Sequence, residues 1–376
     1  MKLVIQSMSR VWGGNEKWFA IVAKGLVSRG HEVVVSCPDG PVRQRLQKAG
    51  LRTSGFRPRG VADPVSGLTF AAWLAFEKPD AILSTSWQSV TWVAAAARAA
   101  KVPRVVVRLG IVRKAPGLGP RSLAFRRSVD ALIVNAPEIR DEWLRTSPGF
   151  AAEKIHLILN GVEQQVRPRE ILRERLRSEL ALPSNAFVVS GAGNISERKG
   201  FDITLRAVAQ LGMRQVHLVI IGDGPYRDTL MSLSAELGIS ERVHWLRRRD
   251  DAADVIAGTD VFVLSSRNEG MANVMLEAMA ARVPVIGTDV SGVRVALGPT
   301  DDRQRAGWIV PPDDHQALSA MLSSVAQNIC AESPEVDAVI SEARWRIESW
   351  FEPGRMIDQA EAAIFGAGAV GVAARA

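Results

Sequence analysis

Two glutamates stand eight positions apart in the stretch Glu269–Ala280, and they are the first candidates for chemistry in this chain. The apolar run at 260–266 predicts a buried strand before them, and the run at 283–288 predicts the next strand after them. Glu269 is therefore expected in a loop, and Glu277 within a helix that is apolar on nearly every side. Such a helix is usually buried, and a buried carboxylate needs partners. We therefore interpret both glutamates as facing a ligand, in preference to capping the helix or lining a solvated face.

Two cations, Arg198 and Lys199, precede Gly200 at the end of another strand–helix loop. Loops of this kind in a doubly wound sheet face the ligand crevice. A lysine acts there as a point charge and an arginine as a planar fork, so the pair can neutralise a diphosphate. The glycines at Gly191 and Gly193 favour this interpretation over a pair of surface cations, because they let the backbone approach a ligand closely.

Two further anion-binding elements are expected at the same edge of the same sheet. One is a glycine turn and the other is the N-terminus of the helix that carries Glu277, because such turns and helix ends present backbone N–H groups to anions. Their residues are Gly222 and Gly224 in the turn, and Gly270, Met271, Ala272 and Asn273 at the helix N-terminus. Three such elements on one crevice suit a nucleotide diphosphate.

The sequence also lacks the pattern by which many proteins hold a metal against a nucleotide diphosphate. No two aspartates stand two positions apart, and Cys37 and Cys330 form neither a metal-binding nor a redox spacing. We therefore expect no metal site and no cofactor. Arg198 and Lys199 are expected to stabilise the leaving diphosphate instead.

The elements that must position these residues alternate between strands and helices along the 376-residue chain. This alternation predicts an α/β fold with parallel, doubly wound sheets, and the length suits two domains. We expect a first Rossmann-like domain over 1–165 and a second over 166–348. A C-terminal amphipathic helix is expected at 349–365 and a frayed tail at 366–376.

The first half has a glycine pair of its own, Gly13 and Gly14, between a short apolar strand and a helix. The helix is expected to bury one face that includes Trp18, Leu26 and Val27. The glycines allow either a ligand contact or a tight turn with no ligand, because the third glycine of a dinucleotide fingerprint is absent.

The net charge of the chain is compatible with several classes of binding partner. The formal net charge is +7 and the isoelectric point about 9.8, which fits nucleic acid, an anionic membrane surface or a phosphorylated substrate. The arginines do not alternate with aromatic residues, so we expect no nucleic-acid partner. Five cations at 113–127 form either a solvated basic face or a surface that meets an anionic acceptor or lipid headgroups.

The expected location is cytoplasmic, with peripheral contact to the inner face of the cell membrane left open. Met1 and Lys2 lead directly into an apolar strand instead of a leader. No apolar run approaches the roughly 20 residues that a membrane-spanning helix needs.

Taken together, these motifs resemble the retaining glycosyltransferases of family 4, which have the GT-B fold of two Rossmann-like domains facing across a cleft. The resemblance spans nearly the whole chain and is most specific over Asp260–Ala280. The other matching segments are 13–16, 29–33, 160–163, 198–200, 222–225, 284–286, 291–292 and the closing helix at 351–365.

The resemblance implies transfer of a hexose-type sugar, with retention at the anomeric carbon, from a UDP-sugar or GDP-sugar. The acceptor would be lipid-linked, a polysaccharide or a small molecule, bound by the first domain. The resemblance further implies that Glu277 holds the ribose hydroxyls and Glu269 the sugar hydroxyls. The amides of 270–273 would lie beside the sugar and phosphate. Gly13 and Gly14 would close over the donor, and the closing helix would return to the first domain.

Arg198, Lys199 and Glu269 are the catalytic candidates under this resemblance. Many members have a histidine near the end of the strand that contains Val107, and here Arg108 stands nearby. Arg108 and Asn160 are therefore candidate phosphate or acceptor contacts. The run at 247–249, three arginines, stands where the family holds the nucleotide base.

Two competing hypotheses fit the same motifs. A nucleotide-sugar 2-epimerase of the same fold would convert the donor without an acceptor. A non-catalytic nucleotide-sugar binder would bind the donor saturably and never turn it over.

Overall fold

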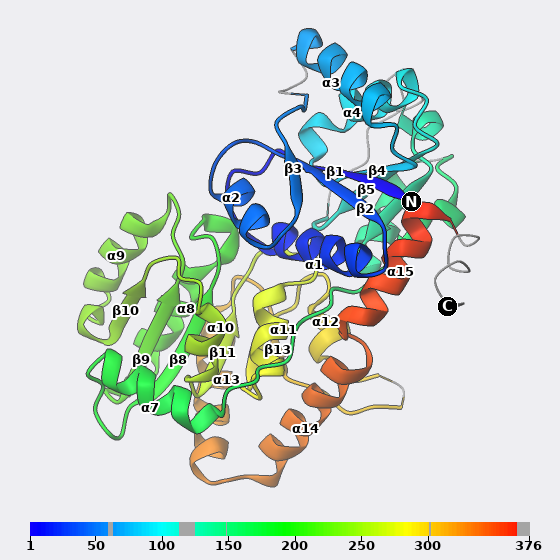
Figure 1. Cartoon of the computed structure of the whole chain (residues 1–376). Helices are drawn as coiled ribbons and strands as arrows, with labels where there is room; N and C mark the ends of the chain where they lie inside the picture. Colours follow the sequence, from blue (N-terminus) through cyan, green and yellow to red (C-terminus); the bar gives the residue numbers. More distant parts are fainter. Residues whose placement is uncertain (59–62, 113–124, 148, 301, 367–376) are drawn as a thin grey trace. The chain divides into compact units, whose positions relative to one another are not determined.

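The structure is a computed structural model that describes residues 1–58, 63–112, 125–147, 149–300 and 302–366 (Figure 1). The chain forms two compact units, each with a parallel sheet of its own. The first unit is Met1–Gly161 together with Pro353–Ala376, and the second is Val162–Glu352. The divisions fall a few residues from the expected boundaries at 165 and 348.

The first sheet has the strand order β3-β2-β1-β4-β5-β6-β7, and every neighbouring pair is parallel. Its strands are β1 (Lys2–Gln6), β2 (Glu32–Ser36), β3 (Arg52–Ser54), β4 (Ala81–Ser84), β5 (Arg104–Leu109), β6 (Ala131–Val134) and β7 (Ile155–Leu157). The strand β3 is an edge strand of three residues that contributes no apolar side chain to the core.

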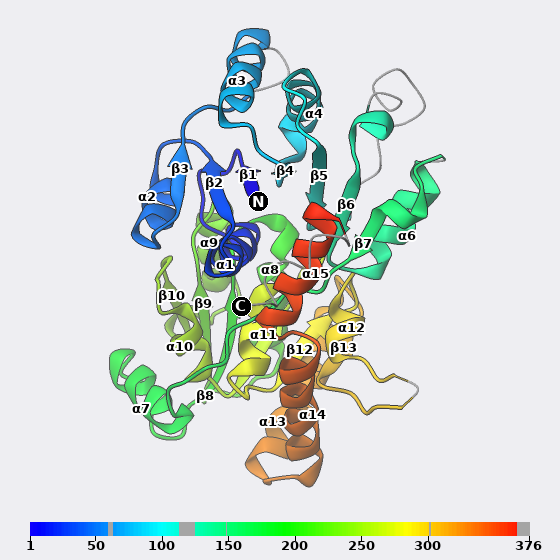
Figure 2. The same ribbon diagram turned by 45° about the vertical axis from the view of Figure 1, so that its right-hand side comes forward.

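Helices cover both faces of the first sheet (Figures 1 and 2). One core lies under α1, α2 and α15, and the other lies under α3, α4 and α6. Their bounds are α1 (Gly14–Ser28), α2 (Pro41–Lys48), α3 (Pro64–Glu77), α4 (Val90–Ala99), α6 (Pro137–Thr146) and α15 (Pro353–Phe365). The expectation that Val27 is buried is wrong. Leu26 points into the core, and Val27, about 100° further round the helix, is exposed.

The C-terminal helix α15 packs against α1 in the first unit. A Cβ added at Gly25 would lie 2.4 Å from Cδ1 of Ile357, so glycine allows this close contact. Glu361 of α15 pairs with Arg29 and, at 2.9 Å, with His31. The chain therefore returns to the first unit after completing the second.

The second sheet has the strand order β10-β9-β8-β11-β12-β13, again all parallel. Its strands are β8 (Phe187–Ala192), β9 (Val216–Ile221), β10 (Val243–Leu246), β11 (Val261–Leu264), β12 (Val285–Thr288) and β13 (Trp308–Val310). Both sheets thus confirm the predicted α/β class with doubly wound parallel sheets.

The helices of the second unit are longer near its C-terminal end. A core of this unit lies among α8, α9, α13 and α14, while α11 packs against α10 and α14. The bounds are α7 (Arg169–Glu179), α8 (Phe201–Gln210), α9 (Arg227–Glu236), α10 (Ala252–Ala257), α11 (Asn273–Ala280), α12 (Val293–Leu297), α13 (His315–Cys330) and α14 (Pro334–Ser349).

Candidate active site

The second sheet brings the predicted anion-binding elements to one edge. Its strand order puts β8 beside β11, and from these two neighbours the sheet grows in opposite directions, which makes their carboxyl ends the topological switch point. Gly193 follows β8, Gly222 follows β9 and Glu269 follows β11. The structure therefore places these loops where open α/β sheets bind their ligands.

Glu269 is the centre of a charged cluster at this edge. It is only 7% exposed, and its Oε1 pairs with Nζ of Lys199 and, at 3.0 Å, with the guanidinium of Arg198. The hydroxyl of Ser266 donates to the same oxygen at 3.2 Å. Burial by itself would raise the pKa of Glu269, but the charges of Lys199 and Arg198 more than offset it and hold the pKa below its ordinary range. Glu269 is therefore an anion at neutral pH and cannot serve as a proton donor there.

The turn that carries the two cations, Glu197–Lys199, is braced by the loop after β11. The backbone N–H of Arg267 donates to the carbonyl of Arg198 at 2.8 Å, and the Ser265 hydroxyl donates to the carbonyl of Lys199 at 3.1 Å. No motif in the sequence indicates these roles, because the partners lie 66 residues or more apart. The brace fixes where both cations stand relative to Glu269.

The side chain of Arg267 completes this brace. Its guanidinium pairs with Asp202 at 2.7 Å and with Asp313 at 2.5 Å, and it also donates to the carbonyl of Glu197 at 2.5 Å. Although Arg267 is a third cation beside the site, its hydrogen bonds go to the protein. We therefore assign it to the support of the site.

Glycines let the loops after β8 and β9 pack on one another. Gly222 has a φ of +144°, and a Cβ there would lie 1.9 Å from the carbonyl oxygen of Gly193. A Cβ at Gly224 would lie 2.2 Å from the carbonyl oxygen of Ile195. At Gly193 a Cβ would meet Cε of Lys199 at 3.1 Å. The side chain of Lys199 thus packs against the backbone of Gly193. Because glycine has no side chain, a ligand diphosphate can approach this backbone closely.

The segment between the two glutamates forms the expected loop and helix. Met271 and Ala272 are buried. Ala272 occupies the N-cap position of α11, and the helix begins at Asn273. A Cβ at Gly292 would lie 2.3 Å from the carbonyl oxygen of Gly270, so the turn before α12 supports this loop. The N-terminus of α11 therefore lies at the same edge as Glu269.

Glu277 is half-buried, in contrast to the expectation of full burial. It lies just over a turn into α11, on the same side as Asn273 and Val274, which are also half-buried. The side chains of Leu276 and Met279 take the core-facing side of the helix. The helix is thus partly exposed along the stripe that carries Glu277.

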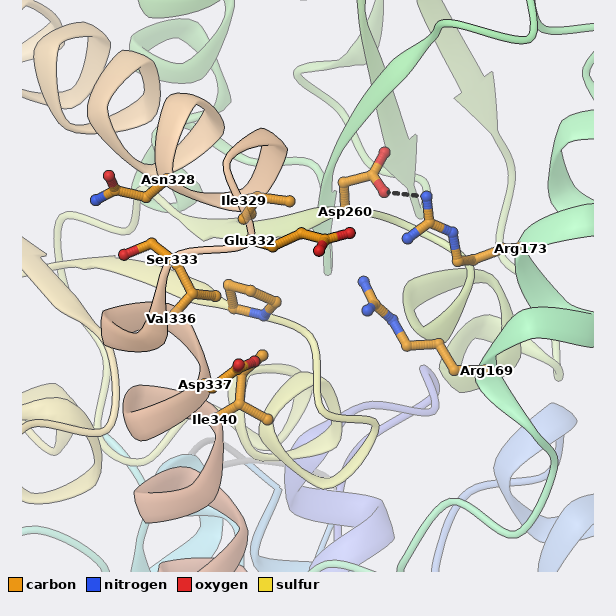
Figure 3. A pocket seen from close by; sticks show the side chains of 11 residues that line it. Arg169, Arg173, Asp260, Asn328, Ile329, Glu332, Ser333, Val336, Asp337 and Ile340 are labelled. Carbon is orange, nitrogen blue, oxygen red and sulfur yellow. Dashed lines mark ion pairs between the residues drawn. The ribbon is translucent and has the colours of Figure 1, made fainter.

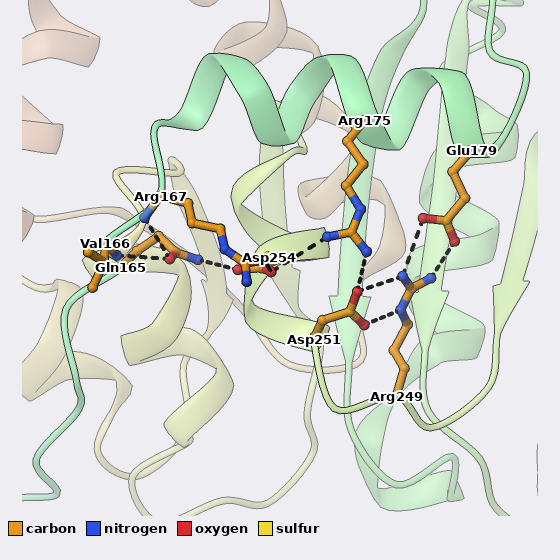
Figure 4. A network of polar contacts seen from close by, with 8 residues as sticks. All are labelled: Gln165, Val166, Arg167, Arg175, Glu179, Arg249, Asp251 and Asp254. Atoms are coloured by element: carbon orange, nitrogen blue, oxygen red, sulfur yellow. Dashed lines mark hydrogen bonds and ion pairs between the residues drawn. The ribbon is translucent and has the colours of Figure 1, made fainter.

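The three arginines after β10 have different surroundings, and Arg249 is structural. It pairs with Asp251 and with Glu179 of α7, each at 2.5 Å. The hydrogen bonds from Arg249 lower the pKa of Asp251 to about 2. Figure 4 shows that the network runs along α7 through Arg175 to Asp254.

Arg247 is the member of the triplet that borders the site. Its Nη1 lies 3.4 Å from Oδ2 of Asp223, which stands between the two glycines of the turn after β9. Arg247 is largely exposed, so this contact leaves it able to meet a ligand at the sheet edge.

The first unit places its glycine pair at the N-terminus of α1. Gly13 caps the helix, and its backbone N–H donates to Oε2 of Glu16 at 3.0 Å. Gly14 is the first residue of α1. The pair therefore forms a strand–helix turn at the carboxyl end of β1, as the sequence predicts.

Arg108 is buried on β5 and bonded within the first unit. It donates to Oδ1 of Asn15 at 2.7 Å and to Oδ1 of Asn160 at 3.2 Å, and its guanidinium lies 4.2 Å from the ring centroid of Trp18. Burial lowers the pKa of Arg108 to about 9, with Glu16 acting in the opposite direction. Arg108 remains a cation at neutral pH. It ties the N-terminus of α1 to the segment after β7.

A second acid–cation cluster lies at the amino end of β11, beside a cavity of about 290 Å³ (Figure 3). The carboxylate of Asp260 pairs with Arg173 and Arg177, each at 2.9 Å, and accepts the backbone N–H of Val188 at 2.8 Å. Arg169, which also lines the cavity, donates to the carbonyl of Thr259 at 2.7 Å. The cluster joins α7 to the starts of β8 and β11.

The candidate residues therefore fall into two groups. One group belongs to the second unit and comes together at the carboxyl edge of its sheet; it comprises Arg198, Lys199, Gly193, Gly222, Gly224, Glu269–Asn273 and Glu277. The other group belongs to the first unit and comprises Gly13, Gly14, Arg108 and Asn160. Two cations held beside bare glycine backbone can bind a diphosphate and stabilise its negative charge as it departs.

Among the described residues, no group of three or more His, Cys, Asp or Glu side chains is arranged to hold a metal ion. In the same part of the chain, no helix is both long and apolar enough to cross a bilayer. Residues 113–124 of the predicted basic segment lie outside the described residues, and so do residues 367–376 of the predicted tail.

Family models match both units. The model described as "Glycosyl transferases group 1" matches residues 173–340, and the model "Glycosyltransferase Family 4" matches residues 12–166. The first match spans the glycine turns, the cation pair and both glutamates of the carboxyl edge.

Similar proteins extend the match over most of the chain. The lipopolysaccharide core biosynthesis glycosyltransferase LpsE of Rhizobium meliloti is 31% identical over 284 residues, covering 74% of this chain and 77% of the relative. A D-inositol 3-phosphate glycosyltransferase of Saccharomonospora viridis is 32% identical over 226 residues, covering 56% of this chain and 50% of the relative.

Solved structures agree on the fold. Anabaena HepE in complex with UDP-glucose superposes with a TM-score of 0.81 at 22% identity, covering 96% of this chain and 99% of HepE. WaaG, a glycosyltransferase involved in lipopolysaccharide biosynthesis, superposes with a TM-score of 0.69 at 18% identity, covering 97% and 100%. Two parallel Rossmann-like sheets and these neighbours establish the GT-B fold.

Proposed function

Because this chain belongs to the group 1 glycosyl transferases of family 4, we propose that it transfers a hexose-type sugar from a UDP-sugar or GDP-sugar with retention of anomeric configuration. The acceptor is a lipid-linked saccharide, a polysaccharide or a small molecule. The observation that carries the proposal is the cluster of Arg198, Lys199 and Glu269 beside glycine backbone at the switch point. LpsE, named for lipopolysaccharide core biosynthesis, supports an acceptor of the cell-envelope class.

The two cations supply the main catalytic effect in this proposal. Arg198 and Lys199 stabilise the negative charge that grows on the diphosphate as the sugar bond breaks. Their effect is large because they are held in place before the reaction and need not reorganise. No divalent metal is needed for this step when protein cations supply the charge. The acceptor proton passes to an oxygen of the leaving phosphate on the same face of the sugar.

Glu269 orients the transferred sugar and does not transfer protons. Its pKa lies below the ordinary range because of Lys199 and Arg198, so it accepts hydrogen bonds from sugar hydroxyls. The amides of 270–273 lie beside the sugar and the phosphate. Glu277, half-buried on α11, accepts hydrogen bonds from the ribose hydroxyls.

The first unit binds the acceptor in this proposal. Gly13 and Gly14 form the turn at the N-terminus of α1 and close over the donor. Arg108 acts beneath them by holding Asn15 and Asn160 in place. We place the enzyme in the cytoplasm, where nucleotide sugars are available.

The experiment that tests the proposal combines a donor panel with analysis of the product. UDP- and GDP-hexoses are incubated with the enzyme in EDTA, and nucleotide diphosphate release is followed with and without candidate saccharide acceptors. NMR of the product should show the anomer of the donor. An inverted product, or turnover that requires added metal, would overturn the corresponding part of the proposal.

The same incubations separate transfer from epimerisation. The relatives named above are glycosyltransferases, which favours transfer. An epimerase would convert the nucleotide sugar to its 2-epimer in the tubes without acceptor, and chromatography of those tubes would reveal it.

A further inference from the structure

Helix α3 of the first unit is apolar on both of its faces. Between Asp63 and Glu77 it has no charged side chain. Its inner face is packed: Phe70 and Trp73 belong to a core of the first unit, and their rings stack at 5.6 Å. A Cβ at Gly67 would lie 2.8 Å from the Trp92 ring on α4, so α3 is seated tightly against its neighbour.

The outer face of α3 is also apolar, yet it is exposed. Val65, Leu68 and Phe76 are 68%, 71% and 81% exposed. Their spacing of three and then eight residues keeps them on one side of the helix, together with Ala72. Phe56, 52% exposed and stacked on Trp73 at 5.9 Å, adds a further exposed apolar side chain beside the helix.

The one polar side chain of that face, Thr69, forms its hydrogen bonds within the helix. Thr69 donates its hydroxyl to the carbonyls of Val65 and Ser66 within the helix, at 3.0 and 3.1 Å. The outer face is therefore a continuous apolar strip about 21 Å long, from the 1.5 Å rise of a 14-residue helix. A helix that is apolar all round is normally covered on every side, and an exposed strip of this kind marks an interaction surface.

The charge of the chain is divided unequally between the two units. Residues 1–161 and 353–376 contain 26 Lys and Arg against 13 Asp and Glu, a formal net charge of +13, whereas residues 162–352 contain 21 against 27, a net charge of −6. Lys78 is exposed and follows α3 directly. The apolar strip therefore lies on the unit whose summed field attracts anions.

We propose that the outer face of α3, defined by Phe56, Val65, Leu68 and Phe76, docks the enzyme on an anionic lipid bilayer. The helix lies in the interface, its apolar strip enters the boundary between headgroups and acyl chains, and the net positive charge of the first unit, with Lys78 next to the strip, attracts the headgroups. Apolar burial and electrostatic attraction both contribute to binding of this kind, so the loss of either should weaken it. Docking through α3 does not depend on the identity of the donor or the acceptor.

A second copy of the chain fits this face less well. A stable dimer buries about 800 Å² on each partner, whereas one helix face about 21 Å long and about 10 Å wide offers roughly 200 Å² in projection. A symmetric contact would also bring two units of formal charge +13 together. Neither the small contact area nor the charge repulsion applies to an anionic bilayer, because a bilayer is extended and negatively charged.

Vesicle sedimentation tests the proposal on the full-length enzyme. Vesicles of phosphatidylglycerol and phosphatidylcholine in equal parts should sediment the wild type, and vesicles of phosphatidylcholine alone should bind it at least about tenfold more weakly. The double variant Leu68→Glu/Phe76→Glu should lose at least about tenfold in partition to the anionic vesicles. The matched control is Ile171→Glu, which changes a 59% exposed apolar residue on α7 of the acidic unit and should bind like the wild type.

Other results would overturn the proposal. It fails if the double variant binds anionic vesicles as well as the wild type does, or if Ile171→Glu weakens binding equally. It also fails if the wild type binds no vesicles but is a dimer by light scattering that the double variant dissociates, since a second copy would then cover α3. Hydrolysis of a nucleotide sugar in solution should be unchanged in the double variant, which keeps this test separate from that of the reaction.

Discussion

The two ends of strand β11 carry charge clusters of similar composition and different consequence. At the amino end, Asp260 pairs with Arg173 and Arg177 and also accepts a backbone N–H. At the carboxyl end, Glu269 pairs with Lys199 and with Arg198. Each is a buried carboxylate between two cations, so residue types alone do not separate a structural cluster from a catalytic one.

The difference lies in what surrounds the cations. The arginines of the first cluster project from a regular helix, α7, and tie it to the sheet. The cations of the second cluster stand in a short turn beside glycine backbone, at the edge where parallel sheets bind ligands. In the proposed reaction, the same ion pairing serves stability at the amino end of β11 and leaving-group stabilisation at the carboxyl end.

Removal of Asp260 should produce the largest change in stability. Asp260→Ala leaves Arg173 and Arg177 without their shared carboxylate, and breaking a buried pair of this kind costs about 3–5 kcal/mol. Urea unfolding should show this loss, while KM for the donor in the folded enzyme stays unchanged. A variant with wild-type stability and a raised KM would reverse the assignment of the two ends.

Removal of Lys199 should mainly affect catalysis. Lys199→Ala should lower kcat about 10²–10³-fold, as the loss of one preorganised charge-stabilising group does. Arg173→Ala, which removes a cation of the other cluster, should retain kcat and lose stability. Steady-state kinetics on both variants gives the comparison. Equal kcat in Lys199→Ala and the wild type would remove the proposed role of the carboxyl-end cluster.

Glu277→Gln should have a smaller effect on turnover than Lys199→Ala and should act mainly on donor binding. A hydrogen bond to a charged group contributes about 1.5–3 kcal/mol, so KM for the nucleotide sugar should rise by about tenfold or more with kcat nearly unchanged. The 2′-deoxy nucleotide sugar provides a control, because it lacks one hydroxyl that Glu277 would hold. If the variant discriminates between the two donors as strongly as the wild type does, Glu277 is not the ribose ligand.

The smallest effect concerns stability in acid. The pKa of folded Glu269 lies below its ordinary value, whereas the unfolded residue has a pKa of about 4.3. Its contribution to stability is therefore fully present above about pH 4.3 and is lost as the pH falls through the lower folded pKa. Glu269→Gln should reduce the dependence of stability on pH in that window, measured by urea unfolding at pH 5 and pH 3. An unchanged dependence would show that Glu269 carries no such linkage.

The arrangement of the fold is largely readable from the sequence. Apolar runs alternate with amphipathic segments, and this pattern predicts the strand–helix order of both sheets. It misses β3, an edge strand of three residues that contributes no apolar side chain to the core, and it also misses β13. The helices α6, α10 and α12 are not predicted either.

The site is predictable only where chemistry is carried by local motifs. The glutamate pair, the cations and the glycine turns stand out as short patterns, and the strand order brings them together. The brace formed by Ser265 and Arg267 and the burial of Arg108 depend on partners far away in the chain. No spacing in the sequence reveals such contacts, so the structure is needed to separate supporting residues from those that face a ligand.

The most direct test of the comparison is equilibrium binding of UDP and GDP by calorimetry in EDTA. The wild type should bind one of the two diphosphates saturably. Lys199→Ala should weaken that binding by tenfold or more, whereas Arg173→Ala should bind like the wild type. Equal weakening in both variants, or no weakening in Lys199→Ala, would contradict the assignment of diphosphate binding to the carboxyl end of β11.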